Sequence, residues 1–156
     1  MNTQFDLKLT GYGWGEIGFA SDKQLVTIVI EYVSDPLADL LQALLRIRKS
    51  ESVLELVGFE SEASLHQMII TEISSNIIRI EIFDNVFFDL IDDEEGIERI
   101  GSPVFSAYCF TYEFIYMICT YLQEFIANYG LDKYLEKWGR PFPDQLLSQL
   151  YVSLRS

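Results

Sequence analysis

The residues best suited to binding chemistry are five carboxylates that stand close together in one short stretch of the sequence. They are Asp89, Asp92, Asp93, Glu94 and Glu95. Carboxylates bind cations and cationic side chains, but this stretch lacks the alternating oxygen ligands and the central glycine of an EF-hand loop. A resident metal ion is therefore not expected, and the segment is predicted to be an exposed acidic loop that attracts a basic partner.

Aromatic side chains supply the candidate apolar anchors for such a contact. Phe87 and Phe88 lie beside the acidic residues, while Tyr12 and Trp14 lie in a glycine-rich stretch near the start of the chain. Aromatic residues are enriched among the side chains that dominate protein–protein binding energy, and they also fill cores. The five carboxylates together with Phe87, Phe88 and Trp14 form the predicted partner-binding set.

No combination of residues predicts catalysis. His66 is the only histidine, so a pair of histidine metal ligands cannot form, and no residue pattern pairs it with a serine nucleophile as in a Ser-His-Asp triad. Gly13, Gly15 and Gly18 match the pattern G-x-G-x-x-G. A strand is predicted to follow them, whereas a dinucleotide site needs a helix N-terminus at that point. The chain is predicted to be non-enzymatic and to use no cofactor.

The overall charge narrows the class of partner. With 24 acidic residues against 11 basic ones, the formal net charge is −13. Such a charge repels nucleic acid phosphates and anionic lipid, and it attracts basic proteins. We therefore expect a basic protein partner, and neither nucleic acid nor a membrane. The alternative is that the charge only keeps an aromatic-rich chain in solution.

Two features favour a cytoplasmic location. The first residues form no basic region followed by the apolar core of a signal peptide. Cys109 and Cys119 are predicted to be buried free thiols, which suit a reducing compartment. Residues 104–122 approach the length of a membrane span, but Glu113 in their middle favours a buried helix instead.

A strand that leads directly into a helix, residues 25–45, organises the rest of the chain. Apolar residues on both faces predict a buried strand. Asp35 is the predicted N-cap of the helix and Pro36 its first residue. A stripe of leucines follows at helical spacing: Leu37, Leu40, Leu41, Leu44 and Leu45. This stripe must be covered by a sheet.

Five further stretches have the alternation and turn residues of strands: residues 5–9, 11–20, 53–59, 65–73 and 76–83. The glycine-rich stretch 11–20 continues the first strand as one long bent strand or forms a second short one. A long apolar helix is predicted to begin at Ser102–Pro103 or at Thr111 and to end at Gly130. A short helix over residues 131–138 and a last helix opened by Pro143 follow.

These elements predict a single α+β domain over residues 1–156. Its expected architecture is an antiparallel, meander-type sheet of five to six strands with helices packed on it.

Three stretches, GYGWGE, EYVSDPLADLL and YGLDKYLEKWGRPFPDQLL, resemble in order and spacing a family of small acidic bacterial proteins with no established activity. The positions that carry the resemblance are Trp14, Ser34, Asp35, Leu37, Tyr129, Gly130, Tyr134, Trp138, Phe142 and Pro143. In size, charge and α+β make-up such proteins are similar to the immunity proteins that protect bacteria from toxins. The resemblance implies a binding protein that neutralises a basic toxin. The alternatives are a structural or regulatory module that acts as a homodimer or larger homo-oligomer, and a small-molecule-binding protein.

Overall fold

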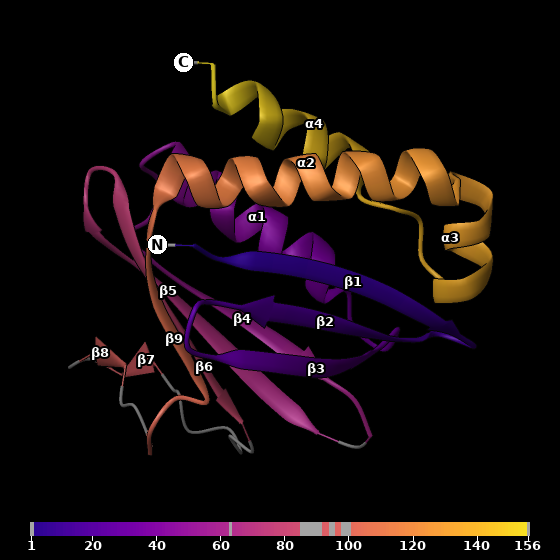
Figure 1. The fold of residues 1–156 in the computed structure, drawn as a ribbon, viewed down its shortest axis with the longest axis horizontal. Helices are drawn as coiled ribbons and strands as arrows, with labels where there is room; N and C mark the ends of the chain where they lie inside the picture. Colours follow the sequence, from indigo (N-terminus) through magenta and orange to yellow (C-terminus); the bar gives the residue numbers. More distant parts are fainter. Residues whose placement is uncertain (1, 63, 85–91, 94–95, 98–100, 156) are drawn as a thin grey trace.

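Two main antiparallel sheets, a short two-stranded pair and four helices make up the described part of the chain. The computed structural model describes residues 2–62, 64–84, 92–93, 96–97 and 101–155. Figure 1 shows the two sheets face to face, with α2 and α4 along one side of them and α3 at one end. The α+β class predicted from the sequence is confirmed, but the strands form two sheets instead of one.

The first sheet is a three-stranded meander in the order β1-β2-β3. Its strands are β1 (Gln4–Gly11), β2 (Trp14–Ala20) and β3 (Leu25–Glu31). One face is buried in the core, because alternate residues such as Phe5, Ile17, Phe19 and Ile28 point the same way. The glycine-rich stretch therefore does not continue the first strand. The chain turns back after Gly11 and forms the second short strand that the sequence left as an alternative.

Helix α1 (Pro36–Arg48) follows β3 and separates the two sheets along the chain. The predicted cap is confirmed: the backbone N–H of Ala38 donates a hydrogen bond to Oδ1 of Asp35 over 3.4 Å. Every leucine of the predicted stripe is buried, and so are Ala43 and Ile47. Because α1 packs against both β4 and α4, it is covered over more of its circumference than a helix lying on one sheet.

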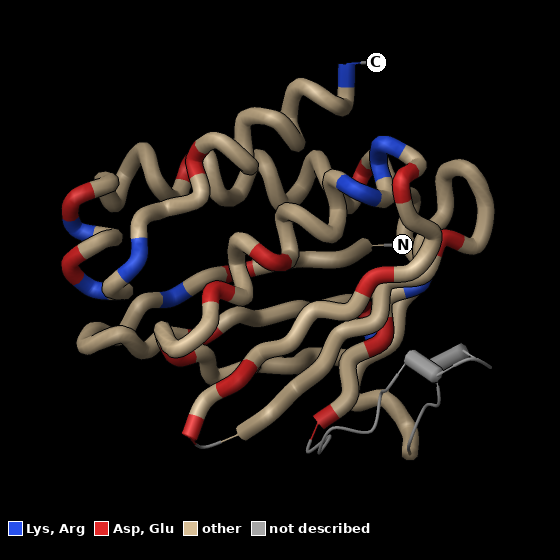
Figure 2. Tube along the Cα trace, turned by 180° about the vertical axis from the view of Figure 1, so that it is seen from behind, with Lys and Arg blue, Asp and Glu red and all other residues tan. Residues whose placement is uncertain are grey.

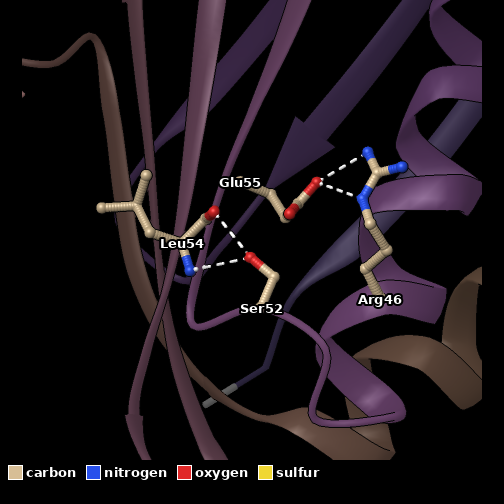
Figure 3. Close-up of polar contacts among 4 residues, drawn as sticks. All are labelled: Arg46, Ser52, Leu54 and Glu55. Carbon is tan, nitrogen blue, oxygen red and sulfur yellow. Dashed lines mark hydrogen bonds and ion pairs between the residues drawn. The ribbon is translucent and has the colours of Figure 1, made fainter. Parts of the chain in front are cut away.

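The turn after α1 is held by polar contacts (Figure 3). The Oγ of Ser52 donates to the carbonyl of Leu54 over 2.8 Å and accepts from its N–H over 3.3 Å. Arg46 forms an ion pair with Glu55 across 2.7 Å. These contacts bring the chain from the end of α1 directly into the second sheet.

The second sheet has four strands in the order β4-β5-β6-β9. They are β4 (Leu54–Glu60), β5 (Leu65–Ser74), β6 (Ile77–Asp84) and β9 (Phe105–Phe110). A short pair, β7 (Asp92–Asp93) and β8 (Gly96–Ile97), lies between β6 and β9 in the sequence. The three predicted meander strands are confirmed. With seven strands in the two main sheets, the predicted number of five to six is wrong.

The additional strand is β9, in a region where the sequence predicted the start of a helix or a loop before one. Phe105 and Cys109 face the core from alternate positions, while Tyr108 is exposed. Helix α2 begins at the second predicted start and spans Thr111–Tyr129. An apolar run that passes from strand to helix without a turn residue has no local boundary signal. Pairing with β6 decides where the strand ends.

The C-terminal helices agree with the prediction. Helix α3 spans Leu131–Trp138 and α4 spans Asp144–Ser153, with Pro143 at the N-cap.

Cys109 and Cys119 are buried and free, and burial raises the pKa of the Cys119 thiol to about 11. No helix in the described part of the chain is long and apolar enough to cross a membrane.

Candidate functional site

The turn between β1 and β2 places an aromatic side chain at an exposed apex. Three consecutive residues have positive φ: Gly11 at 101°, Tyr12 at 59° and Gly13 at 80°. Glycine adopts this conformation freely, whereas a left-handed L-residue costs about 1–2 kcal/mol. The Tyr12 side chain is 97% exposed, so neither packing nor burial within the described chain offsets this cost. Because Gly11 pairs with Trp14, Tyr12 and Gly13 are the two central residues of the hairpin turn, a position that requires positive φ and where asparagine, aspartate or glycine is usual instead of an exposed tyrosine.

Backbone hydrogen bonds from two other segments hold this turn in place. The N–H of Gly13 donates to the carbonyl of Lys137 at the end of α3 over 3.0 Å, and the N–H of Tyr32 donates to the carbonyl of Gly13 over 2.8 Å. The guanidinium Nε of Arg140 donates to the carbonyl of Tyr32 over 2.6 Å. The apex is therefore a rigid feature, braced by the segment after β3 and by the loop after α3.

The ring of Tyr32 completes this brace. It lies so close to Gly13 that a Cβ built there would come within 2.9 Å of its Cγ, and one built on Gly139 would come within 3.4 Å of its Cδ2. The half-exposed ring thus sits between two glycine backbones. We call the residues Gly11, Tyr12, Gly13, Trp14 and Tyr32 the hairpin tip.

The carboxyl group of Asp35 lies near Arg140, the side chain that braces Tyr32. Burial raises its pKa, whereas the hydrogen bond from Ala38 and the positive charge of Arg140 lower it; Asp39 raises it again. The buried indole N–H of Trp138 also lowers the pKa of this carboxyl, although it makes no hydrogen bond of standard geometry. The balance leaves Asp35 easier to protonate than an exposed aspartate.

A pH titration of stability reports on this carboxyl. Because the pKa of Asp35 lies above 3.8 in the folded state, the folded state binds the proton more tightly than the unfolded state. This contribution to stability is complete below the unfolded pKa and is lost as the pH rises through the folded pKa. We expect Asp35→Asn, which keeps the cap, to gain free energy of unfolding relative to wild type as the pH rises above the unfolded pKa, with the gain constant once the pH exceeds the raised folded pKa.

The measurement is urea unfolding at several pH values, with Asp132→Asn as the control, because Asp132 lies exposed in the first turn of α3. A difference between Asp35→Asn and wild type that shrinks with rising pH would contradict the assignment.

The residues that carry the family resemblance meet at this end of the molecule. Tyr134 and Trp138 are buried, and the rings of Tyr134 and Phe142 make an edge-to-face contact at 5.1 Å. Ser34 and Asp35 precede α1, while Trp14 is half-buried at the base of the tip. Most of these positions have a packing or capping role. Tyr12 is the member of the hairpin tip that no packing role explains.

The predicted acidic set falls on a part of the chain where little is described. Asp89, Glu94, Glu95, Phe87 and Phe88 lie outside the described residues. Asp92 and Asp93 form β7, whose backbone pairs with Ile97 and Gly96 of β8. Of the predicted partner-binding set, Trp14 alone has a described side chain. The role of the other members stays a prediction.

Acidic and basic residues are distributed differently over the surface. Figure 2 shows acidic positions along both sheets and the helices, whereas basic ones gather near the end of α1 and around α3. A groove of about 630 Å³ between α1 and α4 is lined by Arg48, Lys49 and Arg155. In the described ranges, no three His, Cys, Asp or Glu side chains are grouped to hold a metal ion.

The sequence indicated some residues of the hairpin tip and gave no sign of the others. Trp14 and Tyr12 stood out as aromatic residues among glycines, but Tyr32 and Arg140 carried no signal, because their roles depend on contacts between distant segments. The G-x-G-x-x-G stretch runs from the turn into β2, as the sequence predicted.

Comparison with protein-family models finds no match, and comparisons with curated proteins and with solved structures find none either.

Proposed function

We propose that this chain is a non-enzymatic acidic protein that binds and neutralises a basic protein partner, a toxin being the class that the family resemblance implies. The observation that carries the proposal is the rigid exposure of Tyr12 at the hairpin tip, 97% accessible and held at a φ of 59°. Because the backbone of the turn is already braced, binding at Tyr12 requires no ordering of the main chain, and the exposed ring buries a large area.

The two parts of the surface have different tasks in this proposal. The net charge of −13 steers a cationic partner to the protein and accelerates association. Tyr12, with the half-exposed ring of Tyr32 beside it, supplies the apolar anchor of the contact. Charge that acts over a distance is weakened by salt, whereas the buried aromatic contact is not.

The test separates the anchor from the fold through Tyr12→Gly. Because glycine adopts positive φ without strain, this variant is expected to raise the free energy of unfolding by about 1 kcal/mol. Loss of the anchor is expected to weaken partner binding at least about tenfold. Stability and binding therefore move in opposite directions, which a purely structural role of Tyr12 would not produce.

The purified protein is used as bait in a lysate of the native organism at low and high salt, and the captured partner is then titrated by calorimetry against wild type and Tyr12→Gly. Val53→Ala, which removes another exposed apolar side chain, is the matched control and should bind like wild type. Capture of a basic protein that weakens as salt rises supports the proposal. If Tyr12→Gly bound the partner as tightly as wild type, Tyr12 would not be an anchor of the contact.

The acidic segment is tested in the same titration. Replacing Asp89, Asp92 and Asp93 with asparagine and Glu94 and Glu95 with glutamine removes five of the 24 acidic residues. We expect slower association and a smaller salt dependence of the affinity. If both were unchanged, the charge of this segment would play no part in binding.

A further inference from the structure

The outer edge of β9 is a second exposed feature of the fold, separate from the hairpin tip. Strand β9 is the last strand of its sheet among the described residues, and it pairs on one side with β6. The N–H of Ser106 points away from β6, because it donates to Oε1 of Gln24 over 2.8 Å. Since groups alternate along an antiparallel strand, Tyr108 and Phe110 also direct their N–H groups outward. Because Gln24 already accepts from Ser106, the outward groups of Tyr108 and Phe110 are the ones that form a template for another strand.

A groove runs along this edge. A cavity of about 700 Å³ lies between β9 and the turn that joins β2 to β3, and its walls include Gln24, Ser106 and Tyr108. A second cavity of about 200 Å³ continues past Phe110 to α2. Asn2 and Thr3 line both cavities. Figure 1 shows the same arrangement: the chain's first residues and the β2–β3 turn lie beside β9. We call these two cavities together the β9 groove.

Exposed aromatic residues border the β9 groove. Tyr108 is 52% exposed and Phe110 is 40% exposed, although both are large hydrophobic residues in a strand. Tyr108 lines the larger cavity and Phe110 the smaller one. Aromatic faces attract the cationic groups of lysine and arginine. The charged residues in the lining are Asp22 and Glu113 against Lys23, so the aromatic border and the acidic majority together suit an occupant that carries basic side chains.

We propose that the β9 groove binds an extended, basic segment of a partner protein as an added strand. Backbone hydrogen bonds to the N–H and C=O groups of Tyr108 supply the pairing, and alternate side chains of the segment contact the aromatic border. A second copy of this chain is disfavoured as the occupant, because each copy carries a net charge of −13. The sign of the occupant's charge rests on the proposed function, whereas the strand edge and the groove stand on their own geometry.

The test uses a defined probe: an acetylated and amidated peptide of alternating lysine and valine, six residues long to match β9. It is titrated into the isotope-labelled protein, and amide shifts are followed by NMR. We expect shifts at residues 106–110 and at Asn2 and Thr3, with slower hydrogen exchange of the Tyr108 N–H. The same peptide with every backbone nitrogen methylated keeps its charge and loses its donors. Its affinity should fall at least about tenfold.

Two substitutions at one position separate backbone pairing from side-chain contact. Tyr108→Pro removes the outward N–H without breaking a bond to β6, and proline is tolerated at such an edge position. Tyr108→Thr removes the ring but keeps the N–H. We expect Tyr108→Pro to abolish the peptide-induced shifts and Tyr108→Thr to retain binding within about threefold of wild type. Val53→Ala, which removes an exposed apolar side chain that lines neither cavity, should bind the peptide like wild type.

The outcomes keep this inference distinct from the proposed function. Equal binding of the methylated and unmethylated peptides, weakened by salt, would overturn strand addition and leave the acidic binding protein standing. Equal binding of an alternating glutamate and valine peptide would overturn the basic occupant. Self-association of wild type that Tyr108→Pro abolishes would assign the edge to a second copy, and an absence of shifts at residues 106–110 would overturn the site itself.

Discussion

Trp138→Ala is expected to lower the free energy of unfolding by about 3–5 kcal/mol, in the range of large-to-small changes in a core. The Trp138 side chain is 1% exposed, and it ends α3 at the point where the loop to α4 begins. Its removal leaves a cavity beside the carboxyl of Asp35 that the braced chain on either side cannot close. Chemical denaturation followed by circular dichroism measures the loss.

The matched control is Trp14→Ala, which removes the same side chain from a half-buried position on β2. Because less of Trp14 is removed from water, we expect a smaller loss of stability, at about half the value for Trp138 or below. Equal losses of unfolding free energy for the two variants would contradict the prediction that packing of Trp138 at the end of α3 stabilises the fold more than packing of Trp14.

Gly13→Ala is expected to destabilise the protein by about 2–4 kcal/mol through two independent causes. The residue has a φ of 80°, which L-residues rarely adopt. In addition, the new methyl group would fall on the ring of Tyr32, which must then leave its place between Gly13 and Gly139. Thermal and urea unfolding of the variant measure the combined cost.

Gly58→Ala provides the control, because a Cβ at Gly58 meets nothing within 4 Å and its φ is not positive. Glycine in a strand interior is less favourable than alanine, so this change is expected to be neutral or to stabilise by up to about 1 kcal/mol. The double variant Gly13→Ala with Tyr32→Ala isolates the second cause, since it removes the ring and leaves the positive φ. Additive losses in this cycle would show that the ring is not displaced.

The hairpin tip and the core beneath it illustrate how binding and stability are related in this fold. Gly11 and Gly13 have positive φ at no steric cost, while Tyr12 between them has a strained backbone and an exposed side chain. The strain is tolerated because the turn is braced from α3 and from the segment after β3. Rigid presentation of Tyr12 thus depends on the same contacts that Trp138→Ala and Gly13→Ala are expected to disrupt.

Elements with strong local signals were predictable from the sequence. Helix α1 has its N-cap Asp35, its Pro36 and its leucine stripe where they were expected. The meander β4-β5-β6 followed from alternation and from turn residues, and α3 and α4 followed from Gly130 and Pro143. In each case the residues that define the element lie within a few positions of one another, so no distant part of the chain was needed.

Other features were decided only by tertiary structure. The apolar run before α2 suits a strand or a helix equally well, and β9 exists because its backbone pairs with β6, more than twenty residues earlier. Helix α1 packs against β4 and α4, and the spacing of its leucines does not specify either partner. The brace of the hairpin tip joins Tyr32 to Arg140, 108 residues apart. Sequence patterns report which local conformation a segment prefers, whereas pairing and close approach depend on which segments meet, and that is the physical reason for the difference.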